Sequence, residues 1–130
     1  MIVRVSILPI LILLAAAAPL TGSARDRVPV ATPAGEPVSC LPLSSIRESL
    51  VRDDRTIDFV TRGRQKVYRV TLPNGCPMLG FEKSFSYATS LSQLCAQDII
   101  TVLRQGGGRI DRGASCGLAP FQPVTLAQRR

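Results

Sequence analysis

The sequence offers few side chains that could carry out catalysis. Its 130 residues include no histidine, which excludes a Ser-His-Asp triad, a Cys-His pair and any zinc site that uses imidazole. The carboxylates that could act as a general acid or base show no spacing that marks a pair: Asp58, Glu82, Asp98 and Asp111. We therefore expect no enzyme activity, no metal and no cofactor, and a histidine-free carboxylate hydrolase is the least favoured alternative.

Four cysteines form an even set in a short chain: Cys40, Cys76, Cys95 and Cys116. In an exported protein of this size such a set predicts two disulfides. They are too far apart in the sequence for a Cys-x-x-Cys metal or redox motif. The loop-closure entropies of the nested and the sequential pairing differ too little to decide between them. We favour the nested pairing, Cys76–Cys95 with Cys40–Cys116, because the ends of a domain often lie close together.

The N-terminus has the features of a secretory signal peptide. Arg4 precedes an apolar run from Val5 to Ala18, and the small residues Gly22-Ser23-Ala24 follow it. The run is shorter than a membrane-spanning helix requires. We expect cleavage after Ala24 and a periplasmic or secreted protein with no transmembrane span after cleavage.

Composition divides the rest of the chain into a folded unit with two tails. Residues 25–39 hold three prolines and no aromatic residue, which predicts a disordered tail. The folded unit is expected over residues 40–124, and residues 125–130 read as a frayed basic end.

Within that unit the dominant hydrophobic period is two, which indicates strands. We expect a hairpin from 57–61 and 67–72, further strands over 85–89 and 98–103, and a weak edge strand over 115–124, where Pro120 and Pro123 interrupt pairing. Residues 45–52 fit either a short helix or a strand, and 90–95 fit one helical turn. The expected fold class is mainly β, a small antiparallel barrel or sandwich of about five strands.

A cluster of basic residues around the expected hairpin is one candidate binding surface: Arg62, Arg64, Lys66 and Arg69. Such a cluster could attract lipid headgroups or acidic glycans. The alternative, which we favour, is a solvated face that keeps the domain soluble. Nucleic acid is not expected as a partner, because Tyr68 is the only aromatic residue nearby and its parity places it inward.

The segment Leu72–Pro77, with the sequence LPNGCP, is a second candidate. Asn74-Gly75 can supply the positive φ angles of a tight turn, and two prolines stiffen its flanks. A rigid loop of this kind suits recognition, although a structural corner that orients Cys76 explains the same features and is favoured. The glycine-rich segment 105–109 lacks the ending of a phosphate-binding loop, and we interpret it as a hairpin connection.

Several short motifs together resemble an uncharacterised family of small exported proteobacterial proteins, a domain of unknown function. These motifs are Cys40-Leu-Pro-Leu43, Asp53-Asp54, LPNGCP, Phe85-Ser-Tyr87, Leu94-Cys95 and Cys116-Gly-Leu118. The resemblance covers residues 40–124 and implies an exported bacterial protein with all four cysteines in the shared pattern. It supplies no activity or ligand. The sequence thus favours a non-enzymatic periplasmic binding or envelope-associated module, whose partner would be an anionic envelope component or another periplasmic protein.

Overall fold

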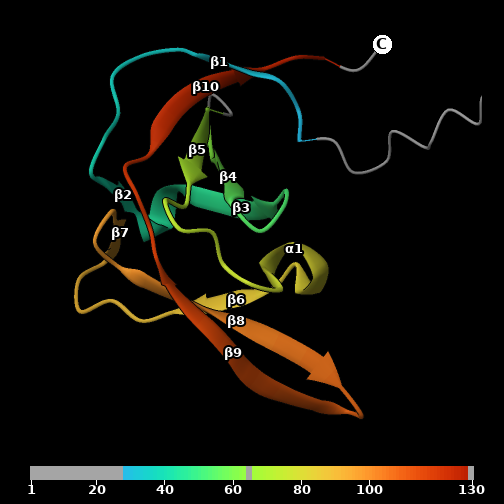
Figure 1. Cartoon of the computed structure of the whole chain (residues 1–130). Coiled ribbons are helices and arrows are strands. Elements are labelled where there is room, and N and C mark those ends of the chain that lie inside the picture. Colours follow the sequence, from blue (N-terminus) through green and yellow to red (C-terminus); the bar gives the residue numbers. More distant parts are fainter. Residues whose placement is uncertain (1–27, 64–65, 129–130) are drawn as a thin grey trace, which may run out of the picture.

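The computed structural model describes residues 28–63 and 66–128, and within these ranges the chain is mainly β (Figure 1). The expected fold class is confirmed, although the strands are shorter and more numerous than five. They are β1 (Ala31–Pro33), β2 (Cys40–Pro42), β3 (Ile46–Val51), β4 (Thr56–Thr61), β5 (Val67–Thr71), β6 (Phe85–Tyr87), β7 (Gln93–Cys95), β8 (Ile99–Gly106), β9 (Arg109–Gly117) and β10 (Gln122–Leu126). The described helices are the 3-10 turn η1 (Leu43–Ser45) and α1 (Leu79–Glu82), neither of which could cross a membrane.

The strands form three antiparallel sheets. The largest has the order β1-β10-β5-β4-β3, the second has the order β6-β8-β9, and β2 pairs with β7. One core joins them, because buried side chains of β4, β5, β7 and β8 belong to a single hydrophobic cluster. Figure 1 shows the five-stranded sheet above the β6-β8-β9 sheet, with β2 and β7 at one side.

Strand β4 lies near the centre of the core. Ile57 and Phe59 project from one face of β4 and are fully buried, as the alternating pattern predicts. Opposite them, β5 contributes Val70 in register with Ile57. Phe59 also meets Phe121 edge to face, with ring centroids 5.5 Å apart. The predicted hairpin of β4 and β5 is therefore confirmed.

The structure shows which of the two alternatives for residues 45–52 is correct, and it contradicts the helical turn expected over residues 90–95. Residues 46–51 are strand β3, preceded by the short η1 turn. The helical turn expected over 90–95 is wrong, because Gln93–Cys95 is strand β7, which pairs with β2. Pairing with β2 allows Leu94 to be buried beside Leu41, which outweighs the local turn signals.

The predictions that residues 25–39 are disordered and that residues 125–130 are frayed are also wrong in part. Ala31–Pro33 forms β1, which pairs with Val124–Leu126 of β10. Val38 makes an isolated bridge to Phe121 within the same stretch. A low density of apolar residues does not prevent order here, since the backbone of this segment completes the ladder of an existing sheet. The predicted signal peptide lies outside the described residues.

Residues 115–124 do not form one edge strand. Their beginning belongs to β9 and their end to β10, which lies between β1 and β5 rather than at an edge. Pro123 is tolerated there because its carbonyl accepts a hydrogen bond from the Ala34 N–H on the β1 side. Its missing N–H faces the same side, opposite Ala34 and one residue beyond the end of β1, so no pair within β1 itself loses a bond.

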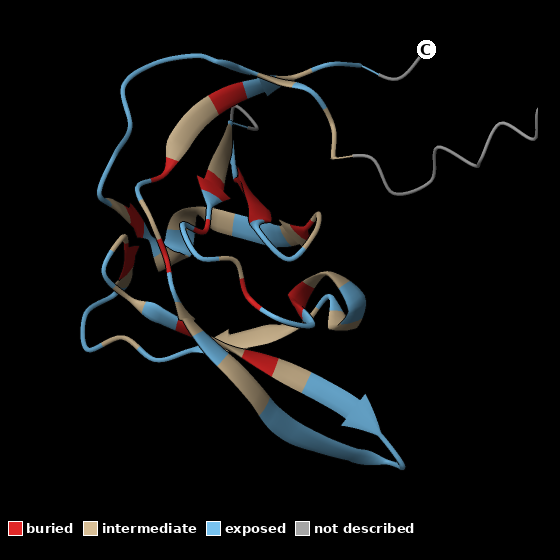
Figure 2. Cartoon of the chain, in the orientation of Figure 1, coloured by how far each residue is buried: buried red, intermediate tan, exposed pale blue. Residues whose placement is uncertain are grey.

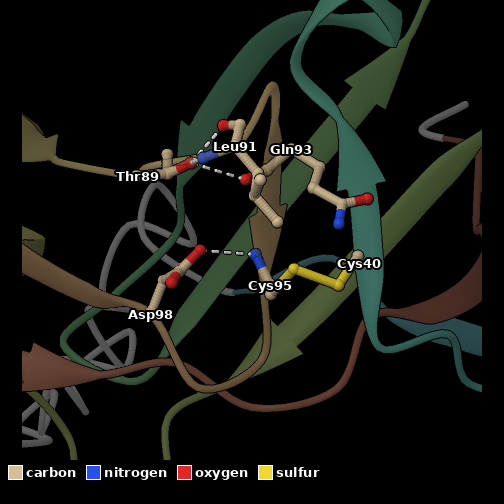
Figure 3. The surroundings of a disulfide bond; sticks show 6 residues. All are labelled: Cys40, Thr89, Leu91, Gln93, Cys95 and Asp98. Carbon is tan, nitrogen blue, oxygen red and sulfur yellow. Dashed lines mark hydrogen bonds between the residues drawn. A yellow bond between two sulfur atoms is a disulfide. The ribbon is translucent and has the colours of Figure 1, made fainter.

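Two disulfides are present, as expected, but their pairing is neither nested nor sequential. Cys40 binds Cys95, and Cys76 binds Cys116, so the two loops cross. Cys40 and Cys95 are directly opposite in the β2–β7 pair; Figure 3 shows this bond, with the Cys95 N–H donating to the Asp98 carboxylate. The nested prediction failed because the folded unit begins before Cys40. The chain ends do meet, but through β1 and β10.

Strands β8 and β9 extend beyond the core as a two-stranded ribbon. The glycine-rich segment connects them, as predicted, through Gly107 and Gly108 at φ angles of 58° and 75°. Both angles are those of a primed hairpin turn, which suits glycine. The far part of this ribbon is exposed on both strands (Figure 2).

Candidate functional site

Asp58, the most buried of the candidate acids, is held by two arginines. Its Oδ2 accepts hydrogen bonds from Arg52 Nε at 2.7 Å and Arg69 Nη2 at 2.9 Å, and its Oδ1 accepts one from Arg69 Nε at 2.7 Å. The Asp58 side chain is fully buried, whereas Arg69 and Arg52 expose 14% and 23% of theirs. A carboxylate held in this way links β4, β5 and the end of β3, and it is closed to a substrate.

The remaining candidate acids lie apart from Asp58 and have local roles. Glu82 accepts a hydrogen bond from the Gln105 N–H at 3.1 Å. Asp98 accepts one from the Cys95 N–H and directly precedes β8, as the sequence indicated. Asp111 lies on the exposed ribbon, opposite Arg104. Among the described residues, groups of three or more acidic or cysteine side chains suited to a metal ion are absent.

The predicted basic cluster is divided by the fold. Arg62 and Lys66 are exposed at the β4–β5 turn, and Arg64 lies outside the described residues. Arg69 points away from that turn into the Asp58 pair, and its Nη1 also donates to the carbonyl of Pro29 at 2.9 Å. Arg69 is therefore a structural residue that ties the N-terminal segment to the sheet.

The LPNGCP loop lies beyond the other end of β5, so it does not share a surface with the β4–β5 turn. Gly75 has the predicted positive φ angle, 67°, and its N–H donates to the carbonyl of Leu72. The Arg55 guanidinium donates to the carbonyls of Leu72 and Pro73. The loop is thus a rigid corner that orients Cys76, the favoured interpretation, and it leads directly into α1.

Helix α1 is the most unusual local structure among the described residues. It has only four residues, and a non-glycine residue with positive φ lies at each end: Met78 at 69° and Lys83 at 56°. Such conformations are unfavourable and persist only where surrounding contacts impose them. α1 displays Phe81, whose residue surface is 77% exposed, while Met78 is 47% exposed.

Contacts with the β3–β4 turn impose this geometry. The Gly80 N–H donates to Asp54 Oδ1 at 2.7 Å, and the Lys83 ammonium donates to the carbonyls of Val51 and Arg52. A Cβ atom at Gly80 would lie 3.0 Å from the backbone of Asp53, so only glycine allows this close approach. The Cys76–Cys116 disulfide anchors the chain just before α1.

We call this region the Phe81 platform: residues 52–55 of the β3–β4 turn together with Met78, Gly80, Phe81 and Lys83. An open pocket of about 550 Å³ lies between its two halves. Three cations and two carboxylates line the pocket, and Phe81 forms part of its wall. Arg52 also belongs to the Asp58 pair, so the buried ion pair fixes one wall of the pocket.

Sequence reasoning located the loop but missed the platform. Phe81 follows no strand or helix period, and Arg55 and Arg52, which line the same pocket, are 26 and 29 residues away in the chain. The one signal that could have found it is Asp53-Asp54, an acidic pair at a turn beside Arg52 and Arg55. Comparison with protein-family models, curated proteins and solved structures found no match.

Proposed function

We propose that this protein is an exported, non-enzymatic binding module that contacts another protein through the Phe81 platform. The observation that carries the proposal is the exposure of Phe81 on a turn that the fold holds rigidly. Burying a phenylalanine side chain is worth about 1.5–3 kcal/mol, so leaving one in water forgoes that stabilisation. A strained turn that nevertheless presents the ring suggests that the ring is covered in a complex.

The composition of the platform supports a protein partner. Aromatic residues, methionine and arginine are enriched in protein interfaces, and the platform combines Phe81, Met78, Arg52 and Arg55. Its backbone is already ordered by the contacts of Gly80 and Lys83, so binding would require little further ordering. Two disulfides fit an oxidising compartment, in agreement with the proposed signal peptide and with the exported family that the sequence resembles.

Photo-crosslinking in the producing cell tests the proposal. Phe81 is replaced by benzoyl-phenylalanine, which keeps an aromatic ring, and the matched control carries the same residue in place of Tyr87, an exposed aromatic residue on β6. We expect discrete adducts with a protein at position 81 and not at position 87. Equal labelling at both positions, or no discrete adduct at position 81, would refute the platform as a binding site.

Polyanion binding at the β4–β5 turn is a second candidate, favoured by the exposure of Arg62 and Lys66 at one end of the sheet. The probe is a vesicle of phosphatidylglycerol and phosphatidylcholine, compared with phosphatidylcholine alone. Arg62→Ala/Lys66→Ala should weaken binding, and Arg47→Ala/Arg104→Ala removes the same charge elsewhere. Attraction between exposed charges must fall as salt rises. Salt-independent binding, or none at low salt, rejects this candidate.

A further inference from the structure

The ribbon that β8 and β9 form beyond the core presents a second surface, distinct from the Phe81 platform. We call its residues 103–112 the β8–β9 arm. Seven consecutive residues at its tip, 104–110, are exposed, as are Asp111 and Arg112 after them. Figure 1 shows the arm leading away from the rest of the molecule, and Figure 2 shows that its tip is exposed.

Hydrogen bonds on the β8 side show which way the backbone groups of the arm point. The Leu103 N–H donates to the carbonyl of Ser84 at 2.9 Å, and the Gln105 N–H donates to Glu82 Oε2 at 3.1 Å. These residues of β8 therefore face away from β9. Alternate residues of a strand point to opposite sides, so Arg104 faces β9.

The same alternation fixes the direction of the β9 groups. Arg104 is in register with Asp111, so the N–H and C=O of Asp111 point back toward β8. The backbone groups of Ile110 and Arg112 then point outward. β9 is the last strand in the order β6-β8-β9, and the described residues include no strand beyond it.

The two edges of the arm thus differ in whether their outward backbone groups are hydrogen-bonded. The β8 edge is covered by Ser84 and by the Glu82 carboxylate, whereas the β9 edge leaves its donors and acceptors open. An open strand edge is a template for pairing with another extended chain. Ile110, 68% exposed, adds an apolar side chain at the centre of this edge.

The charge of the arm indicates which kind of strand could pair with the β9 edge. Arg109 and Arg112 flank Ile110 on the arm, and Arg104 lies across from Asp111, so three cations accompany one carboxylate. The whole chain has a formal charge of +7, which disfavours a second copy at the same edge. Basic residues on an edge strand discourage self-pairing, and an acidic strand would neutralise them.

We propose that the open edge of β9, along Arg109–Arg112, binds an extended acidic segment of a partner protein by adding it as a further strand. The outward N–H and C=O groups of Ile110 and Arg112 supply main-chain hydrogen bonds. Arg109 and Arg112 select acidic side chains, and Ile110 packs against an apolar one.

The test uses a pool of nine-residue peptides with Glu at every third position, the spacing of Arg109 and Arg112, and with Val, Ile, Thr or Tyr between. Lys-for-Glu peptides are the charge control. Binding to the oxidised mature protein is measured by fluorescence anisotropy. Ile110→Pro removes an outward N–H at a position where an edge strand accepts proline. Ile110→Ala keeps the N–H and removes the side chain, which makes it the matched control.

We expect the acidic pool to bind and the Lys pool not to bind. Ile110→Pro should bind about tenfold more weakly than Ile110→Ala, the effect of roughly one net hydrogen bond. Should proline disturb the arm, acidic peptides methylated on alternate backbone nitrogens test the carbonyl acceptors of Ile110 and Arg112 with the unaltered protein. Because they lose more than one hydrogen bond, they should bind at least about tenfold more weakly.

Three results would overturn the proposal. The first is no binding of the acidic pool, and the second is equal binding of the methylated peptides. The third is concentration-dependent dimerisation that Ile110→Pro abolishes, since the edge would then serve a second copy. Phe81→Ala should leave peptide binding unchanged. A negative peptide result therefore counts against the β9 edge alone, and a negative crosslinking result at position 81 counts against the Phe81 platform alone.

Discussion

Asp58→Asn should be among the most damaging single substitutions in this protein. Asparagine keeps the volume of the side chain but removes the charge that balances Arg52 and Arg69. The three hydrogen bonds to the carboxylate, at 2.7–2.9 Å, would weaken or be lost, and two guanidinium groups that are mostly covered would remain without a counter-ion. Removing one partner of a buried ion pair costs about 3–5 kcal/mol.

That cost is large beside the total stability of a domain this size, about 5–15 kcal/mol. Urea unfolding of the oxidised mature protein, followed by far-UV circular dichroism, measures it directly. With a slope of about 1–1.5 kcal/mol per molar urea, the midpoint should fall by roughly 2–5 M. Asp111→Asn on the exposed ribbon is the matched control and should change stability by less than about 0.5 kcal/mol.

A triple variant separates charge imbalance from lost contact. Asp58→Leu with Arg52→Met and Arg69→Met replaces the whole ion pair by apolar side chains of similar size. Buried pairs replaced in this way often lose little stability, so we expect the triple variant to recover most of the loss. If Asp58→Asn lies within about 1 kcal/mol of the unaltered protein, the carboxylate does not hold the sheet and the reasoning is refuted.

Two further substitutions test the disulfides and the platform. Peptide mapping without reduction should recover a peptide linking Cys40 to Cys95, and a peptide that joins different cysteines contradicts the fold. Replacing both cysteines with Ala should lower the free energy of unfolding in urea by about 4 kcal/mol, the loop entropy of a bond that spans 55 residues. Gly80→Ala should lower the free energy of unfolding by about 1–3 kcal/mol, because its Cβ would lie 3.0 Å from the backbone of Asp53. Gly106→Ala is the control: its Cβ meets no atom within 4 Å, and the same measurement should show a loss of less than about 1 kcal/mol. Equal effects of the two glycine substitutions would show that α1 does not need the close approach.

The parts of the fold that sequence could predict are those fixed by local alternation. Ile57, Phe59 and Val70 follow a period of two and lie in the core, and the glycines of segment 105–109 make the predicted hairpin turn. In each case the signal and the structure involve neighbouring residues, so periodicity and turn chemistry are sufficient.

What sequence could not predict depends on pairing across long distances. β1 is ordered only because β10 offers it a partner, and β7 is a strand only because β2 lies beside it. The disulfide pairing follows from these same ladders, which is why loop entropy alone could not choose it. The candidate site shows the same limit: the basic residues were grouped by sequence proximity, yet β5 carries Arg69 into the Asp58 pair and leaves Arg62 and Lys66 at its other end.

The LPNGCP loop connects these structural elements to the proposed function. Cys76, the cysteine of the loop, is bonded to Cys116 of β9, and its N–H donates to the carbonyl of Asp54. The chain then enters α1. The same β3–β4 turn that receives this bond also receives Gly80 and Lys83. A disulfide at Cys76 therefore limits the movement of the one turn that exposes Phe81. Replacing Cys76 and Cys116 with alanine should loosen the Phe81 platform first, because β4 and β5 are also held by their own ladder whereas the chain entering α1 loses its covalent link to β9.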